Sequence, residues 1–301
     1  ARTLYIIYTA MTVLEVIFLF LGGMSLFDSV VHALSTAGTG GFGAYNASAA
    51  NFSPYIQWVL TVFMFLFAIN FNLFYLILLG RMRDVFRNTE FKAFLAMVLV
   101  SVAVITAEIM PLYRTFSDSL RQAAFQVASI ISTTGFITAD FTVWSPLSKV
   151  LLLGLMFVGG CAGSTAGGLK VSRVAILFKM MRRELRHTLR PRVVDVIKMD
   201  GRRLDEQTAH SVAVYFALYI LSIAALIVGL SFSRFDLETN LFAAISCFNN
   251  VGPGFGMVGP VGNYSPYPPL FKLFLSAGML LGRLEIYPML LLFMPAAWRK
   301  R

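Results

Sequence analysis

Three short segments of this chain carry small polar residues followed by glycine, and each lies between two long apolar runs. They occupy residues 35–40, 132–136 and 249–254. Such a glycine lets extended backbone turn its carbonyls toward an axis, and stacked carbonyls can replace the water around a bare monovalent cation. The pattern predicts a repeated pore loop whose cation-binding residues are Thr36, Ala37 and Gly38; Thr133, Thr134 and Gly135; and Asn250, Val251 and Gly252.

The composition places these loops in a membrane. Hydrophobic residues make up 57% of the chain and charged residues 13%, with a mean hydropathy of +0.74, which excludes an ordinary soluble domain. Residues 4–21, 91–110 and 212–230 are the clearest spans, since one crossing takes about 20 residues. Three further apolar runs, 54–79, 146–178 and 269–293, each begin near a proline, which is well tolerated at a helix start.

The segments that lead into the three glycine loops are too short or too polar to cross a bilayer. They cover residues 27–36, 116–133 and 237–250, and each has acidic or hydroxyl residues at its start. Those residues suit the positive end of a helix dipole, which leaves the negative end aimed at the glycine loop and favours a cation there. Irregular backbone at membrane depth is tolerated only inside protein or along a wet cavity, so three such loops predict a shared pore.

The expected fold is therefore an all-α membrane protein, with repeated units of helix, re-entrant pore helix and helix around a central ion pore. The repeat boundaries are predicted at 1–88, 89–200 and 201–301, with Gly38, Gly135 and Gly252 as equivalent positions. The second repeat contains a broken last helix and a basic segment. The chain starts at Ala1 without a signal peptide, so an upstream portion is expected.

The distribution of charge predicts the orientation. The net charge is +10, and the basic residues gather at 81–92, 179–203 and 299–301, on one side of the proposed topology. That side is expected to be cytoplasmic. Nucleic-acid binding is not expected, because no basic patch is interleaved with stacking aromatics, whereas contact with membrane lipids is. Cys161 and Cys247 are separated in the repeat and indicate no disulfide framework.

A dense glycine run interrupts the last apolar run of the second repeat. Residues 159–170 read Gly-Gly-Cys-Ala-Gly-Ser-Thr-Ala-Gly-Gly-Leu-Lys. Each glycine costs about 1 kcal/mol relative to alanine in a helix, so a break is expected. One alternative is a patch of small residues that packs helices closely. A nucleotide-binding loop is a weaker alternative, because Leu169 stands where the phosphate-binding lysine belongs and no strand is predicted before it.

Arg283 is the most unusual single residue. It lies near the middle of the last apolar run, roughly fifteen residues from the basic end, too far for snorkelling. It is expected to face the pore or an acidic partner. A structural ion pair with Glu285 is the alternative, although residues two apart on a helix do not face each other.

The remaining polar residues at membrane depth have structural interpretations. Asn70 is expected to bond between helices, and Glu15 to pair with a neighbour or lie near an interface. His32 and Cys247 are expected to pack behind the pore loops. Asp140 is expected at the outer mouth, where it would either concentrate cations or cap a helix.

Three motifs together resemble those of a known family. They are the glycine run at 159–170 with the basic segment after it, Phe-Asn-Asn-Val-Gly-Pro-Gly at 248–254, and Gly-Arg-Leu-Glu-Ile-Tyr-Pro at 282–288. Over essentially its whole length the chain resembles the Trk/Ktr/HKT superfamily of potassium transporters, and within it the bacterial Trk-type uptake subunits. The resemblance implies four pore-loop units, of which this chain has three and lacks the first.

The same resemblance implies the roles of the site residues and the partners. It implies K⁺ as the transported ion, bound at the filter residues, with no covalently bound cofactor. It implies a homodimer in the bacterial plasma (inner) membrane, with a cytoplasmic ring of nucleotide-binding regulatory subunits. It also implies an intramembrane gate beneath the filter, formed by Gly159, Gly160, Gly163, Ser164, Thr165, Gly167 and Gly168 together with Arg283.

Two other function classes are weighed against ion transport. An enzyme in the membrane needs convergent His, Asp or Cys groups, but the three histidines are scattered and share no helical face, so catalysis is not expected. A non-conducting membrane sensor or scaffold subunit is the alternative that stays open. The loops also depart from the Thr-Val-Gly-Tyr-Gly pattern of potassium channels, so weaker discrimination against sodium is expected.

Overall fold

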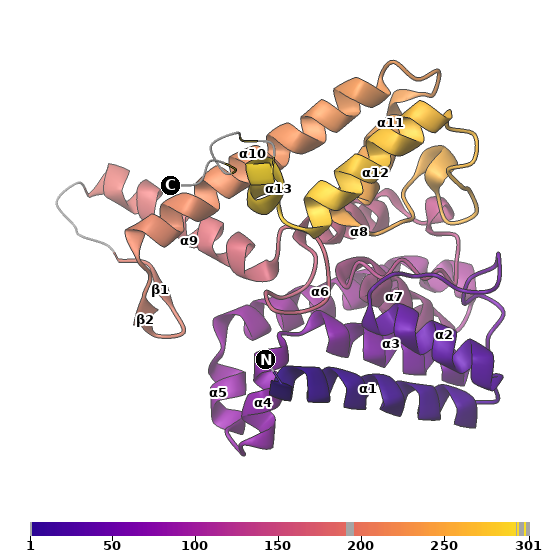
Figure 1. Ribbon diagram of the computed structural model, residues 1–301. Helices are drawn as coiled ribbons and strands as arrows, with labels where there is room; N and C mark the ends of the chain where they lie inside the picture. Colours follow the sequence, from indigo (N-terminus) through magenta and orange to yellow (C-terminus); the bar gives the residue numbers. More distant parts are fainter. Residues whose placement is uncertain (1, 191–195, 293, 295–297, 299–301) are drawn as a thin grey trace.

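The computed structural model describes residues 2–190, 196–292, 294 and 298, and Figure 1 shows how they are arranged. Within these residues the regular secondary structure is helical apart from one two-stranded hairpin. The basic positions Arg192 and 299–301, and the end of the last apolar run at Phe293, lie outside the described residues.

Three helices are long and apolar enough to cross a membrane, as judged by length and composition over the described residues. They are α1 (Arg2–Leu21), α6 (Thr89–Tyr113) and α10 (Glu206–Leu230). Each opens one repeat and covers one of the three predicted spans. Most of their residues are not buried within the protein, which is the arrangement expected when lipid rather than a neighbouring helix covers them.

A short helix follows each of these spans and ends at a pore loop. These pore helices are α2 (Leu26–Ala37), α7 (Phe116–Ile131) and α11 (Leu237–Asn249). Each is capped as its sequence predicts, because the side chains of Ser25, Thr115 and Asp236 accept a hydrogen bond from the backbone N–H three residues on. Hydrogen bonds from Thr239 lower the pKa of Asp236, so this exposed carboxylate stays charged at the positive end of its helix.

The last helix of every repeat is broken, not only that of the second. In the first repeat α3 (Pro54–Ala68) bends by 93° into α4 (Phe71–Leu78), and in the third α12 (Pro269–Arg283) bends by 118° into α13 (Ile286–Leu292). In the second repeat the glycine run separates α8 (Pro146–Val158) from α9 (Val171–Leu189), as predicted. The prediction of continuous helices over 54–79 and 269–293 was therefore wrong.

Local features contribute to these two unexpected breaks. Ile69 is extended, and the Asn70 side chain accepts a hydrogen bond from the Asn72 N–H, so the asparagine starts a new helix instead of bonding between helices. At the other break Glu285 adopts a φ of 66°, which a helix does not accommodate.

The connecting elements gather at the two ends of the molecule. The basic ones are α5 (Met82–Arg87), the outer part of α9, and the hairpin of β1 (Lys198–Met199) and β2 (Arg202–Arg203), which pairs Lys198 with Arg203. They lie together at the left of Figure 1, whereas α2 and α11 extend toward the right. The 3₁₀ turns η1 (Phe141–Val143) and η2 (Gly256–Val258) follow the second and third pore loops. The predicted repeat boundary at residue 88 coincides with Asn88, the N-cap of α6. The predicted boundary at residue 200 lies in the turn between β1 and β2.

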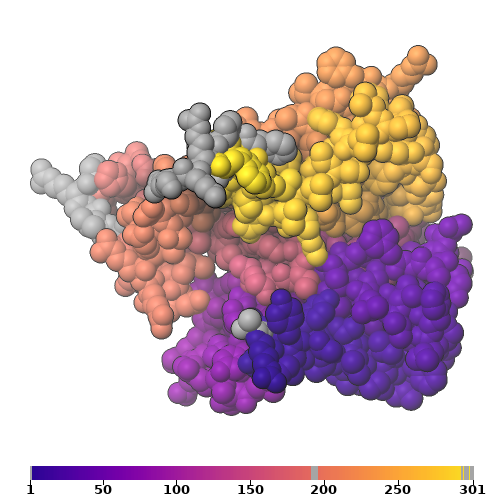
Figure 2. Space-filling model, viewed as in Figure 1, coloured from indigo at the N-terminus to yellow at the C-terminus, as the bar shows by residue number. Residues whose placement is uncertain are grey.

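The middle pore helix forms the centre of the core. From Gln122 to Ile131 every residue of α7 is buried, and α7 packs against α3, α6 and α8. The first and third repeats lie on opposite sides of the second, as the indigo and yellow surfaces in Figure 2 show. This arrangement brings the three pore loops toward the same region of the molecule.

Candidate ion-conduction site

The second and third pore loops have the same backbone conformation. After α7, Thr133 and Gly135 have φ values of 55° and 87°; after α11, Asn250 and Gly252 have values of 57° and 101°. Two positions with positive φ, separated by one residue, turn the chain sharply out of each pore helix.

The hydrogen bonds around these two loops are also equivalent. The Ser129 hydroxyl donates to the Phe136 carbonyl at 2.6 Å, and the Ser246 hydroxyl donates to the Pro253 carbonyl at 2.8 Å. Each serine carbonyl in turn accepts from the residue before the glycine, at 2.9 Å and 3.0 Å. Each serine thus ties the pore helix to the loop on both sides of its glycine. Sequence analysis did not identify either serine.

The first pore loop adopts the same turn, but three residues later in the chain than predicted from matching Gly38 with Gly135 and Gly252. Its positive φ values fall at Thr39 (51°) and Gly41 (68°), and the Gly40 N–H donates to the Ser35 carbonyl at 2.8 Å. Gly38 has a φ of −77° and is only the C-cap of α2. The equivalence of Gly38 with Gly135 and Gly252 was therefore wrong.

A signal for the correct alignment is present in the sequence. A serine precedes the loop glycine by six residues in every repeat, at Ser35, Ser129 and Ser246. Aligning these serines makes Thr39, Gly40 and Gly41 the counterparts of Thr133, Thr134 and Gly135. Three closely spaced glycines, Gly38, Gly40 and Gly41, offer more than one match to the other repeats, so the glycine pattern alone does not identify the equivalent residue.

The three loops lie side by side, in contact through their glycines. A β-carbon built on Gly41 would lie 2.0 Å from the Thr134 carbonyl oxygen, and one built on Gly135 would lie 2.1 Å from that of Val251. Only a hydrogen atom fits at these contacts. A β-carbon on Gly252 would meet nothing within 4 Å among the described residues. The loops thus follow one another in chain order, and the third has an open side.

The glycine run forms a loop directly against the ends of the pore helices. The Gly167 N–H donates to the Thr133 hydroxyl at 2.7 Å, and the Thr39 hydroxyl donates to the Thr165 carbonyl at 3.0 Å. A β-carbon on Gly167 would lie 2.5 Å from the Asn249 carbonyl oxygen. One loop of the second repeat therefore contacts all three pore loops.

The loop also fills the break in the last helix of the first repeat. The Cys161 N–H donates to the Ala68 carbonyl at 2.9 Å, and the Phe71 N–H donates to the Gly163 carbonyl at 3.2 Å. A helix break at membrane depth leaves backbone groups that need partners, and the glycine loop supplies them. No strand precedes this loop in the described part of the chain, which removes the nucleotide-loop alternative. The two ends of the loop pack against each other, with Gly159 beside Gly167 and Gly168, which is a contact within the loop and not the predicted packing of small residues between helices.

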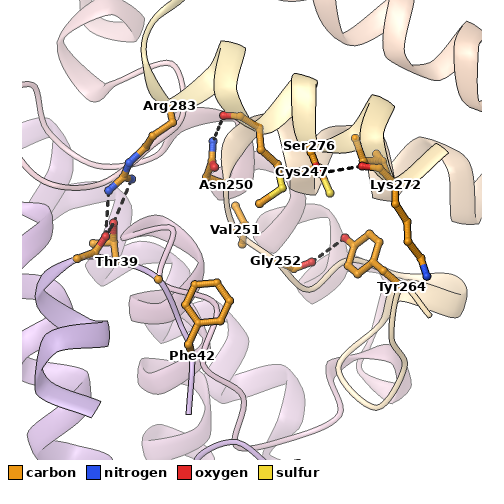
Figure 3. Close-up of a pocket in the computed structure, with 14 residues that line it drawn as sticks. Thr39, Phe42, Cys247, Asn250, Val251, Gly252, Tyr264, Lys272, Ser276 and Arg283 are labelled. Atoms are coloured by element: carbon orange, nitrogen blue, oxygen red, sulfur yellow. Dashed lines mark hydrogen bonds between the residues drawn. The ribbon is translucent and has the colours of Figure 1, made fainter. Parts of the chain in front are cut away.

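Arg283 lies at the C-terminal end of α12 and reaches across to the first repeat (Figure 3). Its guanidinium donates to the Gly38 carbonyl at 2.9 Å and to the Thr39 hydroxyl at 3.2 Å. Glu285 pairs instead with Arg173 at 2.8 Å, so the alternative of an Arg283–Glu285 ion pair was wrong. The third repeat is thereby linked to the pore loop of the first.

Two cavities meet at Arg283. One of about 480 Å³ is lined by the first and third pore loops and by α12, and the Tyr264 hydroxyl at its wall donates to the Gly252 carbonyl at 2.7 Å. The other, of about 370 Å³, is lined by residues 163–168 of the glycine loop with Lys170 and Arg173. Arg283 lines both. Arg283 therefore lies between a space beside the pore loops and a second space lined by the glycine loop.

The other polar residues singled out in the sequence pack or cap within the protein. His32 is fully buried, with Nδ1 2.8 Å from the Asp28 carbonyl and its ring stacked on Phe136, behind the pore loops as expected. Asp140 caps η1 by accepting from the Thr142 N–H at 2.9 Å, in agreement with the capping alternative. Glu15 is fully buried inside the protein.

Three units of helix, re-entrant helix, pore loop and broken helix, with their loops in contact, define a polytopic membrane protein of the pore-loop class. The chain matches the TrkH family, described as cation transport protein, over residues 1–300, and it belongs to that family. It is 36% identical to the Trk system potassium uptake protein TrkH of Escherichia coli K12 over 305 residues, covering 100% of this chain and 62% of that protein.

A second relative has a solved structure. The Trk system potassium uptake protein TrkH of Vibrio parahaemolyticus is 34% identical over 99% of this chain and 62% of its own length. The crystal structure of the potassium transporter TrkH from Vibrio parahaemolyticus superposes with a TM-score of 0.92, covering 99% of this chain and 64% of that one. The chain thus spans somewhat less than two thirds of the length of these relatives.

Proposed function

We propose that this chain forms three sides of a pore that carries K⁺ across a bacterial plasma membrane. The observation that supports this most directly is the set of three pore loops with one backbone turn and mutual glycine contacts. Extended backbone held in this way can present carbonyl oxygens to a dehydrated monovalent cation. The relatives described above are named as potassium uptake proteins, which supports K⁺ as that cation.

In this proposal the filter consists of one triplet from each loop. The triplets are Thr39, Gly40 and Gly41; Thr133, Thr134 and Gly135; and Asn250, Val251 and Gly252. Phe42, Phe136 and Pro253 follow the glycines where potassium channels carry tyrosine, so the filter has fewer ordered carbonyl sites and passes some Na⁺. The ions move down their electrochemical gradient.

The glycine loop at 159–168 acts as the gate, with Arg283 as an electrostatic barrier. The contacts of Gly167 and Thr165 with the pore loops support a gate directly beside the filter. Glycine gives the loop the backbone freedom that opening requires. A fixed positive charge next to it opposes cations standing in the pathway.

The partners and the orientation follow from the same proposal. The end that carries α5, the outer part of α9 and the hairpin faces the cytoplasm, because Lys and Arg are concentrated there and cytoplasmic loops carry an excess of these residues. Membrane lipids surround the exposed apolar helices. The family resemblance supports a homodimer, a fourth pore-loop unit and a cytoplasmic nucleotide-binding ring. Catalysis is not part of this function, and the relatives are named for uptake.

A flux measurement on full-length protein that contains this chain tests the proposal. The protein is reconstituted in vesicles, and K⁺ and Na⁺ fluxes are recorded against empty vesicles. We expect a K⁺ flux larger than the Na⁺ flux. A correctly inserted protein with no flux of either ion would instead support the non-conducting sensor or scaffold.

A further inference from the structure

A buried carboxylate on the first turn of α6 holds both ends of the glycine loop. Glu90 is 6% exposed, and its Oε1 accepts a hydrogen bond from the Ala162 N–H at 2.6 Å. The same oxygen accepts from the Ser172 N–H at 3.0 Å. Ala162 lies at the start of the loop and Ser172 in the first turn of α9, just beyond its end.

One oxygen atom therefore joins two backbone positions on either side of the loop glycines that contact the pore. The Ser172 N–H is one of the donors that a helix start leaves without an intrahelical partner, and a carboxylate is the favoured acceptor there. The Ala162 N–H likewise lies in irregular backbone within the membrane part of the chain. Both donors depend on a side chain from another helix.

From this geometry we propose that Glu90 is a positioning residue that clamps the glycine loop in its closed position against the pore loops. The proposal rests on the proposed gating function of that loop. Glu90 touches no ion. It acts by fixing the distance between the two ends of the loop. Residues 163–168 then keep their hydrogen bonds with Thr39 and Thr133.

The clamp is connected to the basic hairpin through the start of α6. Asp200, in the hairpin turn, accepts from the Thr89 N–H at 2.6 Å and from the Asn88 side-chain amide at 3.0 Å. The Lys179 ammonium donates to the Lys198 carbonyl at 2.7 Å, which ties the hairpin to α9. A displacement of the hairpin would thus move the residue next to Glu90. This path gives a partner bound at the basic end a mechanical route to the gate.

Two substitutions separate the hydrogen bonds of the clamp from its charge. Glu90→Ala removes the acceptor, whereas Glu90→Gln keeps an oxygen at the same position. Glu108→Ala, an exposed carboxylate on the same helix, is the matched control. In full-length protein we expect Glu90→Ala to raise resting K⁺ flux about tenfold, the effect of two ordinary hydrogen bonds, while Glu90→Gln and the control stay near the parent.

A second readout follows the loop itself. Cys161, next to Ala162, is 1% exposed, and its labelling by a small thiol reagent is measured in a Cys247→Ala background. We expect faster labelling in Glu90→Ala and in Asp200→Ala, at an unchanged K⁺ to Na⁺ flux ratio. If Glu90→Ala does not fold, Glu90→Asp, which withdraws the oxygen by one carbon, replaces it and should show a smaller change in the same direction.

The two readouts distinguish failure of this inference from failure of the gate. Faster labelling with unchanged flux would support the clamp but show that the loop is not the gate. Unchanged labelling in folded Glu90→Ala or Glu90→Asp would overturn the clamp, whatever the flux. Equal increases in Glu90→Gln and Glu90→Ala would also overturn it, because the oxygen would then not be what holds the loop.

Discussion

At the scale of single residues, the loop glycines differ in why they must be glycine. Gly41, Gly135 and Gly252 all have positive φ, which costs another residue about 1–2 kcal/mol. Gly41 and Gly135 are constrained a second time, since a β-carbon on either would overlap the carbonyl of the next loop. The contact between loops, more than the turn itself, makes these two positions sensitive.

Replacing Gly135 with serine should therefore disturb the filter. The new β-carbon would displace the Val251 carbonyl, and we expect the ratio of K⁺ to Na⁺ flux to fall severalfold. Gly154→Ser on α8 is the control, because a β-carbon there meets nothing within 4 Å. Ion-competition measurements in vesicles give the ratio, and an unchanged ratio in folded Gly135→Ser would refute the assignment of this loop to the filter.

The corrected register of the first loop gives a second prediction. Gly38→Ala should be milder than Gly41→Ala, because Gly38 has a helical φ and its β-carbon would lie 3.2 Å from the Leu34 carbonyl oxygen, against 2.0 Å from the Thr134 carbonyl oxygen at Gly41. Gly41→Ala should lower selectivity as strongly as a change at Gly135, for the same steric reason. The pair is compared by K⁺ and Na⁺ flux, and the reverse order of effects would restore the original alignment.

At the scale of elements, the breaks in the three last helices support one another. The break between α3 and α4 leaves the Ala68 carbonyl and the Phe71 N–H for the glycine loop, and the end of α12 presents Arg283 to the first pore loop. The second and third repeats thus supply hydrogen-bond partners to the first. The proposed gate therefore depends on the assembled repeats and not on the glycine run alone.

Removing either part of the barrier should raise cation flux in the resting state. We expect Arg283→Ala, or a glycine loop shortened within 163–167, to increase K⁺ flux about tenfold, because the fixed charge of Arg283 repels an approaching cation and the loop obstructs its path. Selectivity should be unchanged. Arg283→Lys keeps the charge and should stay closer to the parent. The gate proposal fails if the shortened loop, correctly inserted, leaves resting uptake as it was.

At the scale of the whole molecule, charge and hydropathy orient the chain. The basic α5, α9 and hairpin share one end, while the caps of the pore helices carry acids such as Asp118, whose pKa is lowered by the Thr115 hydroxyl. The concentration of Lys and Arg at one end predicts a single orientation in the membrane.

Cysteine labelling in intact cells tests that orientation. Leu185→Cys on α9 is exposed and should react with a membrane-impermeant reagent only after the cells are opened, whereas Asn46→Cys and Asn263→Cys should react from outside. Native Cys161 and Cys247 are buried and serve as the background. Reaction of all three from the same side would contradict the topology.

The sequence by itself determined the membrane class, the three spans, the pore helices and the break at the glycine run. These features depend on hydropathy, helix caps and glycine content, which act within a few residues of one another. The match of the predicted spans with α1, α6 and α10 follows from that locality.

Only the tertiary structure decided the register of the first loop, the bends after Ala68 and Arg283, and the partners of Arg283 and Glu90. Each depends on groups far apart in the chain. Gly41 must be glycine because it lies against the Thr134 carbonyl, and the backbone groups at the first bend bond to the glycine loop. Arg283 donates to the carbonyl of Gly38. Hydropathy alone does not distinguish a straight helix from a bent one. The hydrogen-bond partners of the backbone groups at the first bend belong to another repeat.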